Sequence, residues 1–403
     1  MPESGGCWDN RQDAGRTPSF QRTRKSSLSS IPRVGLAFDK EDKMKHWSVE
    51  QAQRWYQAQP WLVGCNFIPS TAINQLEMWQ AETYDPVTID RELGWAEQIG
   101  FNTLRVFLHD LLWSQDAQRF SRRIEGFLAI ATRHGMKVML VLFDDCHRPD
   151  PVLGPQPLPV RGVHNSGWKH SPGQKLVLQF HDGTVSEQEK VRLREYVTGV
   201  LTRFADDERV LLWDIYNEPG NSGNDDKSLE LLAATWQWAR EVPVTQPLSS
   251  GLWLATCGKR VHELNGEQSD VIAFHEYGNA KVLEPLILGL QERFAARPII
   301  CTEYLARSNG ATFQNCLPVF KKHGIGCYNW GLVLGKTQTC FEGKTAEKLA
   351  ELQDAGAFLQ PGEPIPEPKQ GPWLHDIFRP EGTPYDRAET AFIRAITKGR
   401  IAP

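Results

Sequence analysis

Short apolar runs alternate with amphipathic segments along most of this chain. Each run is rich in β-branched or large aliphatic residues and leads through a polar or glycine-containing turn into 10 to 17 residues with helical spacing. We expect these runs to be eight strands, at residues 61–67, 102–108, 137–143, 210–216, 248–254, 271–277, 298–304 and 326–332. The segments between them carry one apolar stripe each, as in Ile89, Leu93, Ala96 and Ile99, which suits a helix packed on a sheet.

Strands that are apolar almost throughout predict a parallel sheet covered by helices, and eight strand–helix units predict its closure. We therefore expect an α/β fold, the (β/α)8 TIM barrel. An open doubly wound sheet is usually indicated by a G-x-G-x-x-G turn after the first strand, and this motif does not occur in the sequence. The barrel is expected to form one catalytic domain over residues 44–403, after a Ser-, Arg- and Pro-rich leader over residues 1–43 that is expected to be disordered. The long connections 144–185 and 333–383 both follow strands, so we expect them at the active-site face.

The amino-acid composition limits the kinds of ligand and the cellular location that can be expected for this protein. The 45 basic and 49 acidic residues leave a net charge of −4, so nothing favours nucleic acid or an anionic membrane surface. No apolar run approaches the ~18 residues that span a bilayer, and no signal-peptide segment is recognisable, so a cytoplasmic location is expected. The cysteines form no C-x-x-C pair, and those inside predicted strands are expected to be buried free thiols. The 14 tryptophans favour a carbohydrate ligand, because flat aromatic faces stack on sugars.

The chemistry of a TIM barrel is expected at the carboxyl ends of its strands. The sequence places polar, acidic or aromatic side chains there: Asn66, Arg105, Asp144, Asp145, Asn217, Glu218, His275, Tyr277, Glu303 and Trp330. Glu218 and Glu303 belong to the fourth and seventh strands, so they should face each other across the barrel mouth, as the two carboxyl groups of a glycoside hydrolase must. No H-x-H motif favours a metal-dependent hydrolase, and neither a metal nor a cofactor is expected.

Two of these segments resemble the catalytic segments of clan GH-A glycoside hydrolases. WDIYNEPGN at 213–221 resembles the strand-4 segment in which Asn-Glu-Pro carries the acid/base, and PIICTEY at 298–304 resembles the strand-7 nucleophile segment. The resemblance implies a retaining β-glycoside hydrolase for glucan-, mannan- or xylan-type substrates. It implies that Glu303 forms a glycosyl-enzyme and that Glu218 acts first as general acid and then as base.

Family 5 of these hydrolases is the nearest resemblance, which extends over about residues 61–390. Arg105 in GFNTLRVF, His275 and Tyr277 in FHEY, and Trp330 in YNWGL are similar to residues of that family. The resemblance implies that Arg105 keeps the nucleophile ionised, that Tyr277 hydrogen-bonds it and that Trp330 floors the subsite. It also implies that Asn217 binds the sugar 2-hydroxyl, and that His275 orients either the substrate or the acid/base.

The sequence departs from family 5 after the third strand, where LFDDCHRPD supplies Asp144 and Asp145 in place of the usual histidine. These two acids are expected either to bind sugar hydroxyls or to form salt bridges with Arg148 or Arg161. Calcium binding is a third alternative, although six or more oxygen ligands are not visible.

Two alternatives to a hydrolase remain open from the sequence. A transglycosidase would share every catalytic residue, whereas a non-catalytic carbohydrate-binding barrel would be expected to have lost one carboxylate. The long connections also suggest a pocket that prefers short oligosaccharides or chain ends, with walls built from their aromatic and histidine residues: Trp168, His164, His170, Trp373 and His375. Asp386 is expected to cap the last helix.

Overall fold

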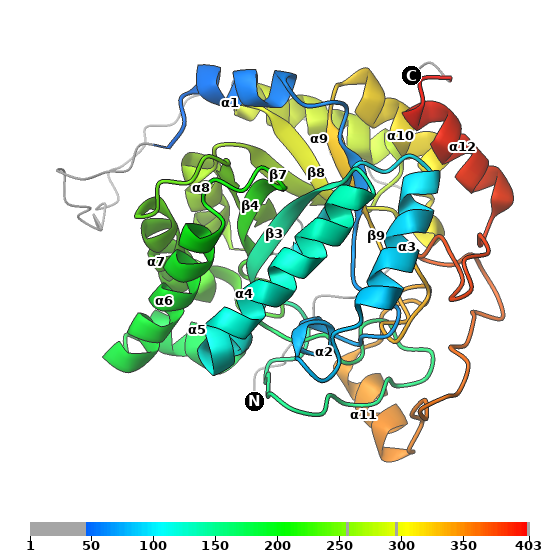
Figure 1. Ribbon diagram of the computed structural model, residues 1–403, viewed down its shortest axis with the longest axis horizontal. Helices are drawn as coiled ribbons and strands as arrows, with labels where there is room; N and C mark the ends of the chain where they lie inside the picture. The colour runs from blue at the N-terminus through cyan, green and yellow to red at the C-terminus, as the bar shows by residue number, and fades with distance from the viewer. Residues whose placement is uncertain (1–45, 255–257, 295–296, 401–403) are drawn as a thin grey trace, which may run out of the picture.

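The computed structural model describes residues 46–254, 258–294 and 297–400, so the predicted leader at 1–43 lies outside the described residues. One curved sheet of parallel strands lies at the centre, with helices around it (Figure 1). The strands are β1 (Val63–Asn66), β2 (Thr103–Phe107), β3 (Lys137–Asp144), β4 (Val210–Asn217), β5 (Leu248–Ser249), β6 (Gly251–Leu252), β7 (Ile272–Glu276), β8 (Ile299–Tyr304) and β9 (Gly326–Trp330). Each overlaps one of the eight predicted ranges, and β5 and β6 share the fifth.

The sheet closes into a barrel through the fifth predicted strand. The strand order is β5-β4-β3-β2-β1-β9-β8-β7-β6, and only Ser250 separates β5 from β6. The hydroxyl of Ser250 donates to the carbonyl oxygen of Tyr216 on β4 at 2.7 Å. The nine hydrogen-bonded strands therefore correspond to the eight strands of a TIM barrel, of which the fifth is interrupted at a single residue. The predicted fold is confirmed.

Helices cover the outside of the barrel. They are α1 (Val49–Gln57), α2 (Gln75–Trp79), α3 (Pro86–Gln98), α4 (Asp110–Arg133), α5 (Gln174–His181), α6 (Glu187–Arg203), η1 (Asp225–Ser228), α7 (Leu229–Arg240), α8 (Lys259–Gln268), α9 (Ala280–Arg293), η2 (Arg307–Asn309), α10 (Phe313–Lys322), α11 (Ala346–Asp354) and α12 (Arg387–Thr397). The stripe predicted on α3 is buried, because Ile89, Leu93 and Ala96 are fully covered. Asp386 caps α12 by accepting the backbone N–H of Ala388 at 2.7 Å, as predicted. Among the described residues, no helix combines the length and apolarity needed to cross a bilayer.

The barrel interior is apolar at one end. Side chains from six of the eight barrel strands meet there: Leu62, Met139, Leu211, Leu212, Val271, Ile300 and Tyr328. Trp55 and Tyr56 of α1 pack against this cluster and cover that end of the barrel. Figure 1 shows α1 at the opposite end of the molecule from α2 and α11, which lie beside the long loops. The polar chemistry is therefore confined to the other end of the strands.

The two long connections pack on each other and form one structure, which we call the loop wall (residues 145–173 and 333–386). Backbone hydrogen bonds join them, including Arg161 N–H to the Ala357 oxygen and Leu359 N–H to the Pro159 oxygen, both at 2.8 Å. Val160 and Val163 form a small apolar cluster with Leu349 of α11. The wall is therefore an ordered part of the fold, and the second connection contains a helix that the sequence did not predict.

Candidate active site

Glu218 and Glu303 lie in one pocket of about 500 Å³ that opens to solvent at the carboxyl ends of the strands. The loop wall contributes His147, His164, Asn165 and His375 to this pocket. The whole lining is Cys146, His147, His164, Asn165, Asn217, Glu218, Asn221, Trp253, Tyr277, Glu303, Trp330 and His375. One carboxylate oxygen of Glu218 and one of Glu303 lie within 4.8 Å of each other.

The backbone turns sharply as it leaves β4, and this turn presents Glu218. Glu218 has φ 44° and Gly220 has φ 95°, both in the left-handed region. A Cβ on Gly220 would lie 2.8 Å from the carbonyl oxygen of Asp225, so only glycine fits there. The Asp145 carboxylate anchors the turn by accepting Gly220 N–H at 2.7 Å and the Ser228 hydroxyl at 2.6 Å. These contacts hold the Glu218 backbone in a conformation that a non-glycine residue rarely adopts.

Glu218 contacts neutral partners. His275 Nδ1 lies 2.6 Å from its Oε1, and the Cys146 thiol and the Asn221 amide both donate to its Oε2. Burial raises the pKa of Glu218, while the hydrogen bonds from Cys146 and Asn221 oppose the rise. Burial also lowers the pKa of His275 to about 4, so this imidazole is uncharged near neutral pH. No cation lies in direct contact with Glu218 among the residues described, which favours its protonated form.

Glu303 contacts a guanidinium group and a phenol. Arg105 Nη1 donates to its Oε1 at 2.7 Å, and the Tyr277 hydroxyl donates to its Oε2 at 2.6 Å. Burial raises the pKa of Glu303 and repulsion from Glu218 adds to the rise, whereas His275, Arg105 and the Tyr277 hydrogen bond oppose it. Arg105 and Tyr277 each bind the ionised carboxylate better than the acid.

Arg105 is the centre of a buried polar layer beneath the pocket. Its guanidinium donates to the Asp214 carboxylate at 2.7 and 3.0 Å, and to the side-chain oxygens of Asn66 at 2.8 Å and Asn217 at 2.6 Å. Burial alone would lower the pKa of Arg105, but Asp214 and Glu303 raise it above its ordinary value. Arg105 therefore stays charged and fixes one oxygen of Glu303 in position.

Within the described residues, Glu218, His275 and Glu303 are the group that could meet one metal ion, since one ligand atom of each lies within 4.8 Å of the others. Two of those ligands are the facing carboxyl groups, and the third is already hydrogen-bonded to Glu218. The same arrangement places the two carboxyl groups in different surroundings: Glu218 lies beside a neutral imidazole, and Glu303 lies beside a guanidinium group.

Residues 70–281 match the family described as Cellulase (glycosyl hydrolase family 5), over more than half of the 403-residue chain. The chain belongs to glycosyl hydrolase family 5. It is a glycosidase, a hydrolase acting on O-glycosyl compounds, as the sequence predicted. Comparison with curated protein sequences finds no match.

Solved structures with the same barrel agree with this family 5 assignment in their fold. The exo-β-1,4-mannosidase Op5Man5 from an Opitutaceae bacterium is 17% identical with a TM-score of 0.53, over 85% of this chain and 60% of that chain. GH5_18 from Streptomyces cattleya, in complex with Manβ1-4GlcNAc, is 12% identical with a TM-score of 0.53, over 84% of this chain and 79% of that chain. The endo-β-1,4-mannanase from Thermotoga petrophila is 12% identical with a TM-score of 0.50, over 85% and 77%.

The family 5 site divides the ten predicted residues into two groups. Glu218, Glu303, Asn217, Tyr277 and Trp330 line the pocket. The other five lie outside its lining: Asn66, Arg105, Asp144, Asp145 and His275.

The expectation that Asp144 and Asp145 bind substrate or an arginine is corrected by their contacts. Asp144 accepts the Asn217 amide at 2.8 Å and the Trp168 indole N–H at 2.6 Å, and neither acid pairs with an arginine in the described residues. Burial raises the pKa of Asp144 to about 8, while those hydrogen bonds oppose the rise. Both acids are fully buried and hold protein groups in place, Asp144 the side chain of Asn217 and Asp145 the turn after Glu218.

Asn66 and Arg105 act in the same indirect way in this family 5 chain. Asn66 donates to the Thr302 carbonyl oxygen at 2.8 Å and accepts from Arg105, so its amide has protein partners at both ends. Arg105 is completely buried. Arg105 contacts Glu303 directly, and Asn66 acts through Arg105 and the backbone of Thr302.

Other predicted wall residues lie in different places. His164 and His375 line the pocket, Trp168 lines a neighbouring cavity, and Trp373 stacks on Tyr385 with ring centroids 4.8 Å apart. His170 is buried away from both cavities. The sequence analysis missed further residues of the site: Cys146, His147, Asn165, Asp214, Asn221 and Trp253. Asp214 had a signal, because an acid in the middle of an apolar strand needs a buried partner.

Proposed function

We propose that the chain is a retaining β-glycoside hydrolase in which Glu218 is the general acid/base and Glu303 the nucleophile. The observation that carries this proposal is the approach of the two carboxyl groups, whose nearest ligand oxygens lie within 4.8 Å. Retaining enzymes hold these groups about 5 to 5.5 Å apart, whereas inverting enzymes need about 6.5 to 9.5 Å to admit a water molecule. The short separation leaves room for direct attack on the anomeric carbon.

The surroundings of the two groups support the division of roles. In the first step Glu218 gives its proton to the leaving oxygen, and the ionised Glu303 attacks the anomeric carbon with loss of the leaving group. In the second step Glu218, now a carboxylate, takes a proton from water, and that water displaces Glu303. Arg105 and Tyr277 stabilise Glu303 as a carboxylate before attack and after release.

Asn217 and Trp330 are proposed to contact the sugar at the cleavage site. Asn217 lines the pocket, and its Nδ2 donates to Asp144 and lies 3.8 Å from the Cys146 sulfur, a weak partner that a sugar 2-hydroxyl could replace. Trp330 is held by edge contacts with Phe107 and Trp168, with centroids 5.8 and 5.5 Å apart. Its ring is therefore fixed as a platform for the sugar.

The loop wall supports a preference for short oligosaccharides or chain ends. It brings His164, Asn165 and His375 to the same pocket as the two carboxyl groups, so one side of the site is closed. The substrate panel begins with β-mannosides, because the solved structures compared above include a mannosidase, a mannanase and a complex with Manβ1-4GlcNAc. β-Glucosides and β-xylosides complete it.

The test is the configuration of the first sugar released. Hydrolysis of nitrophenyl β-glycosides, followed by NMR from the first seconds, should give the β-anomer before mutarotation. An α-anomer formed first would contradict the retaining mechanism, and no turnover on any glycoside of the panel would contradict the hydrolase itself.

With polymeric mannan or glucan, reducing sugar should appear without rapid loss of viscosity. A rapid loss of viscosity would instead show an open endo cleft.

A further inference from the structure

Asn165 is a buried polar residue of the loop wall. It is 1% exposed, and neither its Nδ2 nor its Oδ1 finds a hydrogen-bond partner among the described residues. Its backbone is fixed, because its N–H donates to the Thr337 oxygen at 2.8 Å and its oxygen accepts the Trp168 N–H at 3.2 Å. The main chain at Asn165 is thus tied by one hydrogen bond to the other long connection and by one to its own loop.

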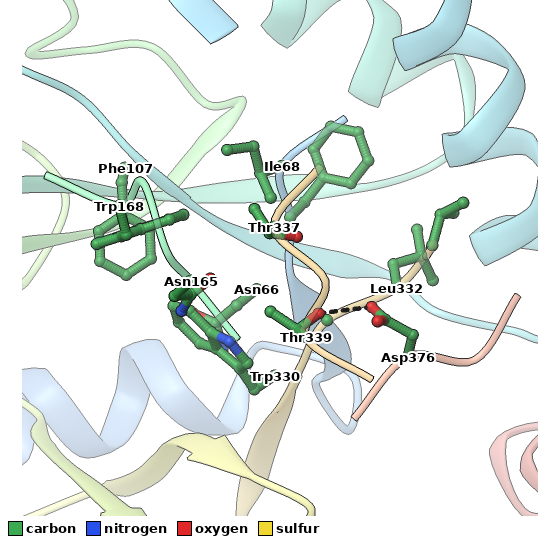
Figure 2. A pocket seen from close by; sticks show the side chains of 13 residues that line it. Asn66, Ile68, Phe107, Asn165, Trp168, Trp330, Leu332, Thr337, Thr339 and Asp376 are labelled. Carbon is green, nitrogen blue, oxygen red and sulfur yellow. Dashed lines mark hydrogen bonds between the residues drawn. The ribbon is translucent and has the colours of Figure 1, made fainter. Parts of the chain in front are cut away.

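The position of Asn165 points to the sugar at the cleavage site. Asn165 and Trp330 both line the pocket that holds Glu218 and Glu303, and both also line the cavity of about 320 Å³ beside it. Figure 2 shows this second cavity, with Asn165 and Trp330 labelled on it and Asp376 hydrogen-bonded to Thr339. Asn165 therefore borders the tryptophan on which the sugar is proposed to rest.

The chemistry of an unpaired amide identifies its partner. A buried donor or acceptor without a partner costs about 1 to 3 kcal/mol, and beside a pocket a water molecule or a ligand can supply the missing partner. An asparagine side chain offers one donating and one accepting group side by side. Two neighbouring hydroxyls of a sugar provide the complement, since one can accept while the other donates. A ligand group that only accepts hydrogen bonds, or only donates them, would satisfy only half of the amide.

The backbone at this position explains why asparagine is suited to it. Asn165 has φ 47°, in the left-handed region that asparagine, aspartate and glycine tolerate best. Glycine would fit the backbone but supply no amide, and aspartate would supply acceptors only. These two residues therefore serve as test substitutions that keep the loop conformation.

We propose that Asn165 determines sugar specificity by binding two adjacent hydroxyls of the sugar that rests on Trp330, donating from Nδ2 to one and accepting at Oδ1 from the other. This inference rests on the proposed function, because it needs a glycoside in the pocket. It adds one residue to the recognition of the sugar that is cleaved. This residue belongs to the long connection after the third predicted strand.

The test measures kcat/KM for wild type, Asn165→Gly and Asn165→Asp on the best nitrophenyl glycoside and on its single deoxy analogues. Wild type should discriminate about 10- to 100-fold against the deoxy analogues at two adjacent positions, as expected for a lost hydrogen bond that strands a buried amide group. Asn165→Gly should lose this discrimination at those two positions and keep it at the others. Asn165→Asp should lose the discrimination only at the hydroxyl to which the Asn165 amide group donates.

A matched control is His170→Ala, which changes a buried residue of the same loop outside the pocket lining. It should leave every deoxy ratio unchanged, even where it lowers the unfolding temperature. If Asn165→Gly retains the wild-type ratios, water or protein motion satisfies the amide and the inference is overturned while the proposed function stands. If wild type hydrolyses no glycoside at all, the proposed function fails and the inference fails with it.

Discussion

The ends of β4 and β8 carry the same functional group in opposite surroundings. Glu218 follows β4 and contacts a neutral imidazole, a thiol and an amide. Glu303 lies within β8 and contacts a buried guanidinium group and a phenol. Burial raises the pKa of both carboxyl groups, but within the part of the chain that the structure describes a full positive charge contacts Glu303 and none contacts Glu218.

In the proposed mechanism, this difference divides one chemical group between two roles. The positions of the two residues are set by strand ends, whereas their pKa values are raised by burial and then lowered to different extents by their partners. In the proposed mechanism, a layer that binds the carboxylate form of Glu303, while no described cation contacts Glu218, gives a nucleophile and an acid. The following changes test that division, from the largest expected effect to the smallest.

Substitution Glu303→Ala should have the largest effect. Without a nucleophile no glycosyl-enzyme forms, so kcat should fall by about 1,000-fold or more on every substrate, whatever its leaving group. The measurement is kcat on dinitrophenyl and on unactivated glycosides. Glu92, a buried acid beside Ser70 and outside the pocket, provides the control as Glu92→Gln; equal losses in both variants would contradict the special role of Glu303.

Substitution Glu218→Ala should have an effect that depends on the leaving group. Only a poor leaving group needs protonation, so kcat/KM should fall by about 100- to 10,000-fold on an oligosaccharide. The first step with a dinitrophenyl glycoside should change little. Rates measured across a series of phenols should show a steep dependence on leaving-group pKa that wild type lacks, and a parallel loss across the series would contradict the acid role.

Substitution Tyr277→Phe removes one hydrogen bond to Glu303 and should lower kcat/KM by about 10-fold. The Tyr277 hydroxyl donates to the ionised carboxylate, so its loss raises the pKa of Glu303 further. In the proposed mechanism activity requires ionised Glu303, and the acid limb of the pH profile should therefore move to higher pH. Tyr196→Phe, which removes a buried hydroxyl bonded to the Leu142 oxygen, should cost about 1 kcal/mol of stability and leave the limb in place.

Substitution Cys146→Ala should have the smallest effect, about two- to fivefold on kcat/KM. Burial raises the pKa of the Cys146 thiol well above its ordinary value, so it remains a donor to Glu218, at 3.1 Å. Its loss removes a contact that lowers the pKa of Glu218, and activity requires protonated Glu218, so the alkaline limb should move to higher pH. A buried cysteine away from the pocket provides the control as Cys316→Ala, and an alkaline limb that moves to lower pH in Cys146→Ala would count against this reasoning.

The strands could be predicted because each is a nearly uninterrupted apolar run, and the end of a strand in a barrel locates the site. That argument places Glu218 and Glu303 at one mouth without any contact being known. It could not show the break at Ser250, because the run 248–254 has the composition of one strand.

Side-chain partners across the barrel were harder to predict. Asp144 was expected to bind sugar hydroxyls or an arginine, but the register of β3 with β4 pairs it with Asn217, so its carboxylate holds that amide. Asn165 gave no signal, because the long connections have no periodicity and their contacts with each other depend on the whole fold. A residue's place at a strand end is a local property, whereas its partner is a long-range one.

The most direct test of the division between Glu218 and Glu303 is the anomeric configuration of the sugar azides formed when azide rescues each alanine variant. In Glu303→Ala the azide takes the place of the nucleophile and attacks once, so the account predicts an inverted α-glycosyl azide. In Glu218→Ala it attacks the glycosyl-enzyme in the second step, so a retained β-glycosyl azide is predicted. NMR of the two products decides the matter: a β-azide from Glu303→Ala, or an α-azide from Glu218→Ala, would contradict the assignment of nucleophile and acid.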